Sequence, residues 1–181
     1  IELCRIMNYL HSFKPNPILY LDLHPGNLLI CREQLKLIDF DQAALASLSQ
    51  ERSVCYGTKG FAAPEQYEGG TLDERTDIYA IGALLYYMGT GHAPEGEIKA
   101  GQGSCRGDLY ILMGRCLRTE KKERCQSVRE VLEALEKLEA RIFAERHIPL
   151  LRIAAAGSRS GIGVTHTALG AVRYLRQKGV S

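Results

Sequence analysis

The segment Tyr20-Leu21-Asp22-Leu23-His24-Pro25-Gly26-Asn27 is predicted to be a loop, because its proline and glycine interrupt regular structure. Two short apolar runs, Leu28–Ile30 and Leu35–Ile38, follow it and predict a β-hairpin that ends at Asp39-Phe40-Asp41. An aspartate beside a Pro-Gly turn is commonly only a turn residue, and an aspartate after a strand is commonly a cap. The order of loop, hairpin and second aspartate is therefore what indicates a functional site.

Helices predicted from apolar periodicity surround this loop. The stretch Asp77–Met88 is apolar on almost every face, which is typical of a helix buried at the centre of a domain. The sequence Ser127-Val128-Arg129-Glu130 predicts a capping box, in which the serine and the glutamate satisfy the first free N–H groups of a helix. The other helices are predicted at Ile1–His11, Leu109–Leu117 and Val128–Arg146.

Between the hairpin and the central helix, residues 39–70 show weak periodicity and predict a long structured loop, which in a compact domain is usually functional. A second, glycine-rich loop is predicted at Gly89–Gly107.

Motifs in this order resemble those of protein kinases, and they cover residues 1–143. Tyr20–Asn27 resembles the catalytic loop H-R-D-L-K-P-x-N, and Asp39-Phe40-Asp41 resembles D-F-G. The remaining matches are Gly57–Glu65, with A-P-E at Ala63-Pro64-Glu65, then Asp77–Gly82 of the central helix and Cys116–Arg124 of a late turn. The resemblance implies a mainly α-helical, kinase-like large lobe with short β-hairpins. The Gly57-Thr58 pair is similar to the serine/threonine class, and the short Gly57–Gly60 loop resembles bacterial members.

The resemblance also implies roles for individual residues. Asp22 would be the catalytic carboxylate, and Asn27 and Asp39 would bind ATP through Mg²⁺, which prefers oxygen ligands. Thr58 would bond near Asp22 and shape the substrate site, and His24 would stand where a lysine normally contacts the transferred phosphate. ATP, Mg²⁺ and protein substrates are the expected cofactors and partners.

Structural roles are implied for three further residues. Glu65 and Arg124 are expected to form a buried ion pair. The carboxylate of Asp77 is expected to accept backbone N–H bonds from the catalytic loop, and a simple helix N-cap at Asp77 is the alternative.

Several residues depart from the family pattern, and these departures allow a second function besides catalysis. Tyr20-Leu21 replaces His-Arg, so we expect activity that does not depend on phosphorylation of the loop at Ser53 or Thr58. A largely neutral His24 gives weaker charge stabilisation than lysine, and Asp41 replaces a glycine. The alternative to an active kinase is a pseudokinase or scaffold that binds partners without phosphoryl transfer.

The predicted lobe occupies residues 1–146, and the sequence contains no glycine-rich nucleotide loop and no strand lysine of the kind found in the small lobe. That small lobe would precede Ile1, so the chain alone is expected to be inactive.

A second unit is predicted at residues 147–181, as the first β-α unit of an incomplete α/β domain. Leu150–Ala156 predicts a buried strand, Gly157–Gly163 a turn and Thr165–Lys178 a helix. This tail resembles the start of a P-loop ATPase of the deviant Walker A group, although Val164 stands where that motif has its lysine. A tight βα turn without nucleotide is the equally open alternative.

Composition indicates which partners and which cellular compartment to expect. The net charge of +2 gives no electrostatic reason to expect nucleic acid as a partner. No apolar run reaches membrane-spanning length. The six cysteines show no CxxC pair, which favours reduced thiols in a cytoplasmic protein over a disulfide framework.

Overall fold

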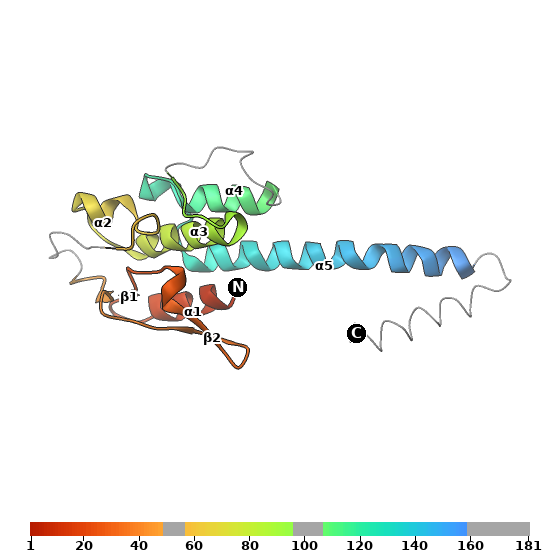
Figure 1. Cartoon of the computed structure of the whole chain (residues 1–181), viewed down its shortest axis with the longest axis horizontal. Helices are drawn as coiled ribbons and strands as arrows, with labels where there is room; N and C mark the ends of the chain where they lie inside the picture. Colours follow the sequence, from red (N-terminus) through yellow and green to blue (C-terminus); the bar gives the residue numbers. More distant parts are fainter. Residues whose placement is uncertain (49–56, 96–106, 159–181) are drawn as a thin grey trace. The chain divides into compact units, whose positions relative to one another are not determined.

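The computed structural model describes residues 1–48, 57–95 and 107–158, with side chains up to Ala144 (Figure 1). The chain divides into two units, Ile1–Leu138 and Glu139–Ser181. The helices are α1 (Glu2–His11), α2 (Pro64–Glu68), α3 (Glu74–Thr90), α4 (Gly107–Cys116) and α5 (Val128–Ser158), with short 3₁₀ turns η1 (Pro25–Asn27) and η3 (Lys121–Glu123). The strands are β1 (Ile18–Leu19), β2 (Leu28–Cys31), β3 (Gln34–Leu37) and β4 (Ala44–Leu45).

Helix α3 lies at the centre of the first unit, as its all-round apolar sequence predicts. Ile78, Ile81 and Ala83 are at most 1% exposed, and α4 packs along the helix (Figure 1). The close approach of α3 and α4 depends on Gly82, because a Cβ at this position would lie 2.5 Å from the Cβ of Cys116. The core is therefore built around α3.

The predicted hairpin is confirmed. Strands β2 and β3 pair antiparallel from Leu28 opposite Leu37 to Cys31 opposite Gln34. Arg32 and Glu33 form the turn with positive φ angles of 51° and 63°, the left-handed geometry that two-residue hairpins prefer. The hairpin thus begins directly after Asn27 and ends two residues before Asp39.

Helix termini follow the local sequence. Asp73 is the N-cap of α3 and accepts from the N–H of Arg75. At α5, the Ser127 hydroxyl accepts from the Glu130 N–H, while the Glu130 carboxylate reaches back to the N–H of Gln126. The predicted capping box is therefore present, with its return bond one residue earlier than expected.

Two predictions about secondary structure are wrong. Residues 150–156 were expected to form a strand, but α5 continues through them to Ser158. A lone strand needs a partner for its backbone groups, whereas the leucines and alanines of this stretch are good helix formers. The predicted loop at 39–70 is interrupted by β4 and by α2. The expected helix Thr165–Lys178 and most of the turn before it lie outside the described residues.

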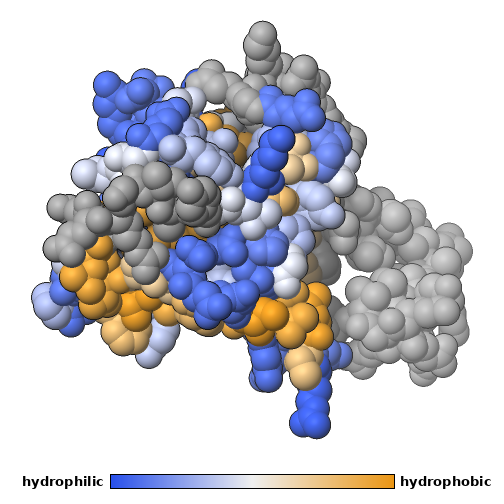
Figure 2. All heavy atoms as spheres, turned by 60° about the vertical axis from the view of Figure 1, so that its left-hand side comes forward, coloured by the Kyte–Doolittle hydropathy of each residue, from blue (hydrophilic) through white to orange (hydrophobic). Residues whose placement is uncertain are grey.

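Apolar side chains remain on the surface of the hairpin region. Leu29, Ile30 and Phe40 are 49%, 82% and 46% exposed. Figure 2 shows apolar surface along the lower edge of the molecule, the side on which Figure 1 draws β2 and α1. None of the helices in the described ranges combines the length and apolar character that a membrane span requires.

The Gly82 contact predicts a stability effect. Gly82→Ala should lower the free energy of unfolding by about 1–3 kcal/mol, because the new methyl group overlaps Cys116 and forces α3 and α4 apart. Gly114→Ala is the matched control, since its Cβ would meet no atom of the described residues within 4 Å. That helical substitution should be neutral or stabilise by up to about 1 kcal/mol. Urea denaturation of both variants decides the matter; equal stabilities would contradict the packing argument.

Candidate active site

Asp22 is held from two directions. Its Oδ1 accepts the Thr58 hydroxyl at 2.7 Å and the Thr58 N–H at 3.2 Å. The amide nitrogen of Asn27 donates to the Asp22 carbonyl at 3.0 Å and lies 3.4 Å from Oδ2. Three segments therefore meet at the Asp22 carboxylate: the loop after β1, η1 and the segment before α2. Of the two carboxylate oxygens, Oδ2 has the weaker contact.

The hairpin connects this group to Asp39. The Asn27 carbonyl accepts the N–H of Ile38 at 3.0 Å, and the hydroxyl of Tyr20 donates to the Ile38 carbonyl. Asp39 follows directly, with φ of 60° and an exposed carboxylate that accepts from the N–H of Asp41 at 3.3 Å. Burial, reinforced by the charge of Asp22, raises the pKa of Tyr20 to about 12, so its hydroxyl stays protonated and able to donate.

His24 stands beside Asp22. Its Nε2 lies 3.7 Å from the Asp22 Oδ2, and its Nδ1 accepts the N–H of Gly26 at 3.2 Å. His24 is the N-cap of η1, so its ring is tied to the turn that positions Asn27.

Asp77 anchors the backbone in front of Asp22. Its carboxylate accepts the N–H of Tyr20 at 2.9 Å and of Leu21 at 2.8 Å, and it is 1% exposed. Leu21 has a positive φ of 67°, an unfavourable conformation for a leucine that these bonds help to hold. The alternative interpretation of Asp77 as a helix N-cap is wrong, because α3 begins at Glu74, three residues before Asp77, and its N-cap is Asp73.

Two supporting residues were missed in the sequence analysis. The His11 Nε2 lies 2.8 Å from the Asp77 carboxylate, with its side chain 8% exposed. The Gln66 amide donates to the Leu21 carbonyl at 2.8 Å and accepts from the N–H of Ala63 at 3.0 Å. Gln66 directly follows the A-P-E motif and His11 ends an amphipathic helix, so neither carries a signal of its own in the sequence.

Glu65 and Arg124 form the expected ion pair. The two guanidinium nitrogens lie 2.7 and 2.8 Å from the two carboxylate oxygens, and Arg124 is 1% exposed. Arg124 also donates to the carbonyls of Arg75, Arg118 and Thr119. The pair is fully hydrogen-bonded and joins α2 to the turn that precedes α5.

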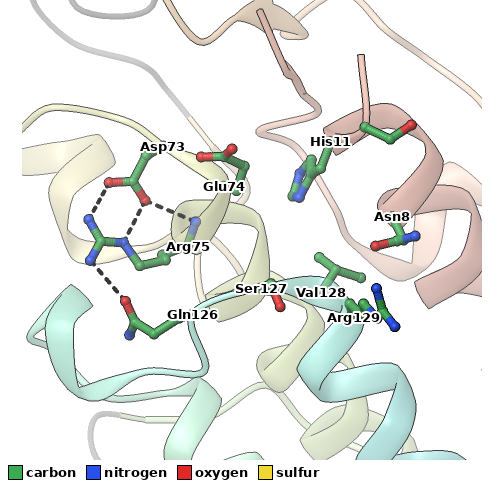
Figure 3. A pocket seen from close by; sticks show the side chains of 10 residues that line it. Asn8, His11, Asp73, Glu74, Arg75, Gln126, Ser127, Val128 and Arg129 are labelled. Carbon is green, nitrogen blue, oxygen red and sulfur yellow. Dashed lines mark hydrogen bonds and ion pairs between the residues drawn. The ribbon is translucent and has the colours of Figure 1, made fainter. Parts of the chain in front are cut away.

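A separate pocket of about 470 Å³ lies where α1 ends and where α3 and α5 begin (Figure 3). Charges of both signs line it, including Glu74 and Arg129, and His11 forms part of its wall. Figure 3 shows Asp73 bound to Arg75, which in turn bonds Gln126. No residue of the Asp22 group contributes to this pocket, and its mixed charge favours no one class of ligand.

Two side chains at the loop and hairpin carry oxygen atoms of the chemical type that Mg²⁺ takes as ligands. The side-chain nitrogen of Asn27 donates to Asp22, so Oδ1 of Asn27 takes no part in that hydrogen bond. Asp39 has an exposed carboxylate. Both are hard oxygen donors of the kind that Mg²⁺ prefers. The described residues contain no cluster of three or more His, Cys, Asp or Glu side chains suited to a metal. The fit therefore rests on an amide and a carboxylate that would share the ion with phosphate oxygens and water.

The sequence that forms this loop, hairpin and central helix matches a known family. Residues 1–147 match the family model described as the protein kinase domain, and the chain belongs to this family. It is 30% identical over 166 residues to serine/threonine-protein kinase A of Synechocystis sp., covering 78% of this chain and 32% of that protein.

Other relatives come from plants and bacteria. Integrin-linked protein kinase 1 of Arabidopsis thaliana is 30% identical over 174 residues, which cover 89% of this chain and 36% of that protein. Serine/threonine-protein kinase PknB of Mycolicibacterium smegmatis is 35% identical over 99 residues, 51% of this chain and 15% of that protein. The chain spans about a third of the length of the first two relatives.

The ion pair predicts a large loss of stability on truncation. Arg124→Ala should lower the free energy of unfolding by about 3–5 kcal/mol, because Glu65 would be left buried without its partner. Arg129→Ala, which removes an exposed pair with Glu133, is the control and should cost less than about 1 kcal/mol. Thermal unfolding measures both; an unchanged melting temperature for Arg124→Ala would contradict the structural role.

Asp73 predicts a pH dependence. Burial alone would raise the pKa of Asp73, but hydrogen bonds from Arg75 and Lys121 outweigh burial and lower it from 3.8 to about 2. The stabilisation is therefore complete above about pH 4 and is lost as the pH falls toward 2. In Asp73→Asn the side-chain amide can still cap α3, so the difference in free energy of unfolding between this variant and the wild type reports the contribution of the negative charge of Asp73. Urea unfolding should show that difference, about 1–2 kcal/mol after screening, at pH 5 and a smaller one at pH 3. A constant difference would oppose this assignment.

Proposed function

We propose that this chain forms the large lobe of a serine/threonine protein kinase that transfers the γ-phosphate of ATP to serine or threonine residues of other proteins. The observation that carries the proposal is the Asp22 carboxylate, fixed by Thr58 on one side and by Asn27 on the other. Phosphoryl transfer depends mostly on positioning and on neutralising charge, so a rigidly held carboxylate beside hard oxygen donors suits it.

The hydrogen bonds of Asp22 suggest which oxygen acts. Oδ1 accepts two hydrogen bonds from Thr58, whereas Oδ2 lies 3.4 Å from the Asn27 amide nitrogen and 3.7 Å from Nε2 of His24. Oδ2 is thus the oxygen available to take the proton of a substrate hydroxyl. Thr58, which bonds the same carboxylate, would place the substrate chain beside it.

Asn27 and Asp39 would hold Mg²⁺, which when bound neutralises charge on the phosphate oxygens. The hairpin sets the position of Asp39 relative to Asn27 through the bond from Ile38. A fixed hairpin of this kind would allow Asn27 and Asp39, which flank it in the sequence, to coordinate the same ion. Residues 1–146 would form the large lobe. The nucleotide site would be completed by a region that corresponds to parts of the relatives outside the matched segment.

A pseudokinase is the second candidate. It is favoured by Leu21, buried where kinases carry an arginine, and by Asp41 in place of a glycine. The presence of Asp22, Asn27 and Asp39 favours catalysis.

We further propose a cytoplasmic location. Cys116 and Cys125 support it, because both are free thiols although their sulfur atoms lie 4.0 Å apart.

The decisive measurement is a kinase assay on the full-length protein that contains this chain. Asp22→Asn should lower kcat by about 100-fold or more, because no carboxylate remains to accept the proton. Asp39→Ala should abolish Mg²⁺-dependent turnover. Gly114→Ala, far from the site in α4, should keep wild-type kcat. Equal activity in the wild type and both aspartate variants would refute the assigned chemistry, and an inactive wild type that still folds would favour the pseudokinase.

A further inference from the structure

The side-chain amide of Gln66 is bound at both ends. Its nitrogen donates to the Leu21 carbonyl at 2.8 Å, and its oxygen accepts the N–H of Ala63 at 3.0 Å. Because a carbonyl only accepts and a backbone N–H only donates, these two partners allow a single orientation of the amide. Gln66 is 1% exposed, so water does not compete for either bond. The amide is therefore fixed in place by two neutral hydrogen bonds.

The bond to Leu21 acts on the backbone of Asp22. A peptide group is planar, so the Leu21 carbonyl lies in one plane with the N–H and the Cα of Asp22. A donor that holds the carbonyl oxygen therefore orients the whole plane as far as that Cα. The Asp22 side chain starts from the same atom, so a rotation of the plane would displace the carboxylate.

Other contacts of the loop act on different groups. Asp77 accepts N–H groups from the two preceding peptide planes, and Thr58 binds the Asp22 carboxylate itself. Leu21 has a positive φ of 67°, a conformation that a leucine keeps only when its surroundings hold it. The bond from Gln66 restrains what these contacts leave free, the rotation of the plane between Leu21 and Asp22.

The segment that carries Thr58 passes against the same amide. A Cβ on Gly57 would lie 2.9 Å from Nε2 of Gln66 and 3.4 Å from the carbonyl oxygen of Leu21. Glycine at this position therefore allows the close approach of the segment to the hydrogen bond. The Gln66 amide thus lies where the first turn of α2, the catalytic-type loop and the Thr58 segment meet.

We propose that Gln66 is a positioning residue for phosphoryl transfer, which directs the Asp22 carboxylate by fixing the peptide plane between Leu21 and Asp22. This rests on the proposed kinase function. Gln66 acts through the backbone in this role, and it neither accepts nor gives up a proton. Its loss should therefore slow the chemical step and leave nucleotide binding unchanged.

Replacement of the amide tests the positioning role in the full-length protein. Gln66→Met removes both hydrogen bonds and keeps a side chain of similar length. We expect kcat to fall by about 10- to 100-fold, because small displacements of a catalytic group are costly, and KM for ATP to stay within about twofold. Wild-type kcat in Gln66→Met, with or without a raised KM, would overturn the proposal.

A matched control separates positioning from lost stability. Val131→Ala truncates a buried side chain of α5 and should lower the melting temperature. Measured at a temperature at which each variant is folded, Val131→Ala should keep the wild-type kcat. An equal loss of kcat in Val131→Ala and Gln66→Met would show that Gln66 serves stability alone and would refute its positioning role.

Gln66→Glu tests the donor hydrogen by its pH profile. A protonated glutamate has nearly the shape of glutamine and can donate to the Leu21 carbonyl, whereas an ionised glutamate can only accept. Burial raises the pKa of such a carboxyl, so the ratio of wild-type to variant kcat should shrink as the pH falls from about 8 to about 6. Groups common to both proteins cancel in this ratio. A ratio that stays constant or grows would contradict the proposal.

The peptide plane is also observable without an assay. In full-length protein labelled with ¹³C-carbonyl leucine and ¹⁵N-aspartate, magnetic resonance spectra select Leu–Asp peptides. The signal of the peptide between Leu21 and Asp22 is assigned by its absence in Asp22→Asn. This signal should move in Gln66→Met and stay in place in Gly114→Ala. An unchanged signal in Gln66→Met would refute the restraint on the plane.

Failure of the kinase proposal looks different. A folded wild type with no more turnover than Asp22→Asn would refute the kinase function, and the restraint on the plane would still be decided by the spectrum. Turnover in the wild type with unchanged kcat in Gln66→Met would refute the positioning role alone.

Discussion

The carboxylate of Asp77 is the contact on which the rest of the site depends. It is buried in α3 and binds the backbone N–H groups of Tyr20 and Leu21, immediately before Asp22. A buried carboxylate needs such partners, because an unpaired charge in the core is strongly unfavourable. His11 adds a third contact from α1. The helix at the centre of the core therefore fixes the backbone from which the proposed catalytic residue projects.

A second set of contacts closes the site from the other side. Thr58 lies before α2, and α2 is joined to the turn ahead of α5 by the pair of Glu65 and Arg124. Gln66 binds the Leu21 carbonyl, so Leu21 is held through both its N–H and its carbonyl. The positive φ of Leu21 is thus supported at both ends by side chains distant in sequence. The segment before α2 and the loop that carries Asp22 are therefore connected through these bonds.

Patterns with strong local causes were predictable from the sequence. The hairpin followed from two apolar runs around a short turn, and α3 from a stretch apolar on every face. Long-range partners were not predictable in this way: His11 and Gln66 act through single hydrogen bonds that leave no periodic signal. The strand expected at 150–156 was wrong because apolar runs of that length suit a helix as well as a strand. Asp22, Asn27 and Thr58 were singled out by motif order, and the structure brings them together, while their chemistry remains a proposal.

The anchoring by Asp77 also bears on how the molecule opens. The amides of Tyr20 and Leu21 lie outside any helix or strand ladder, and loop amides of this kind ordinarily exchange with solvent by small local fluctuations. Here their hydrogen bonds end on a buried side chain of α3. Releasing them takes two hydrogen bonds from the buried carboxylate of Asp77, which makes local opening of the loop costly. We therefore expect the amides of Tyr20 and Leu21 to exchange with solvent more slowly than ordinary loop amides, although the sequence of this segment is that of a turn.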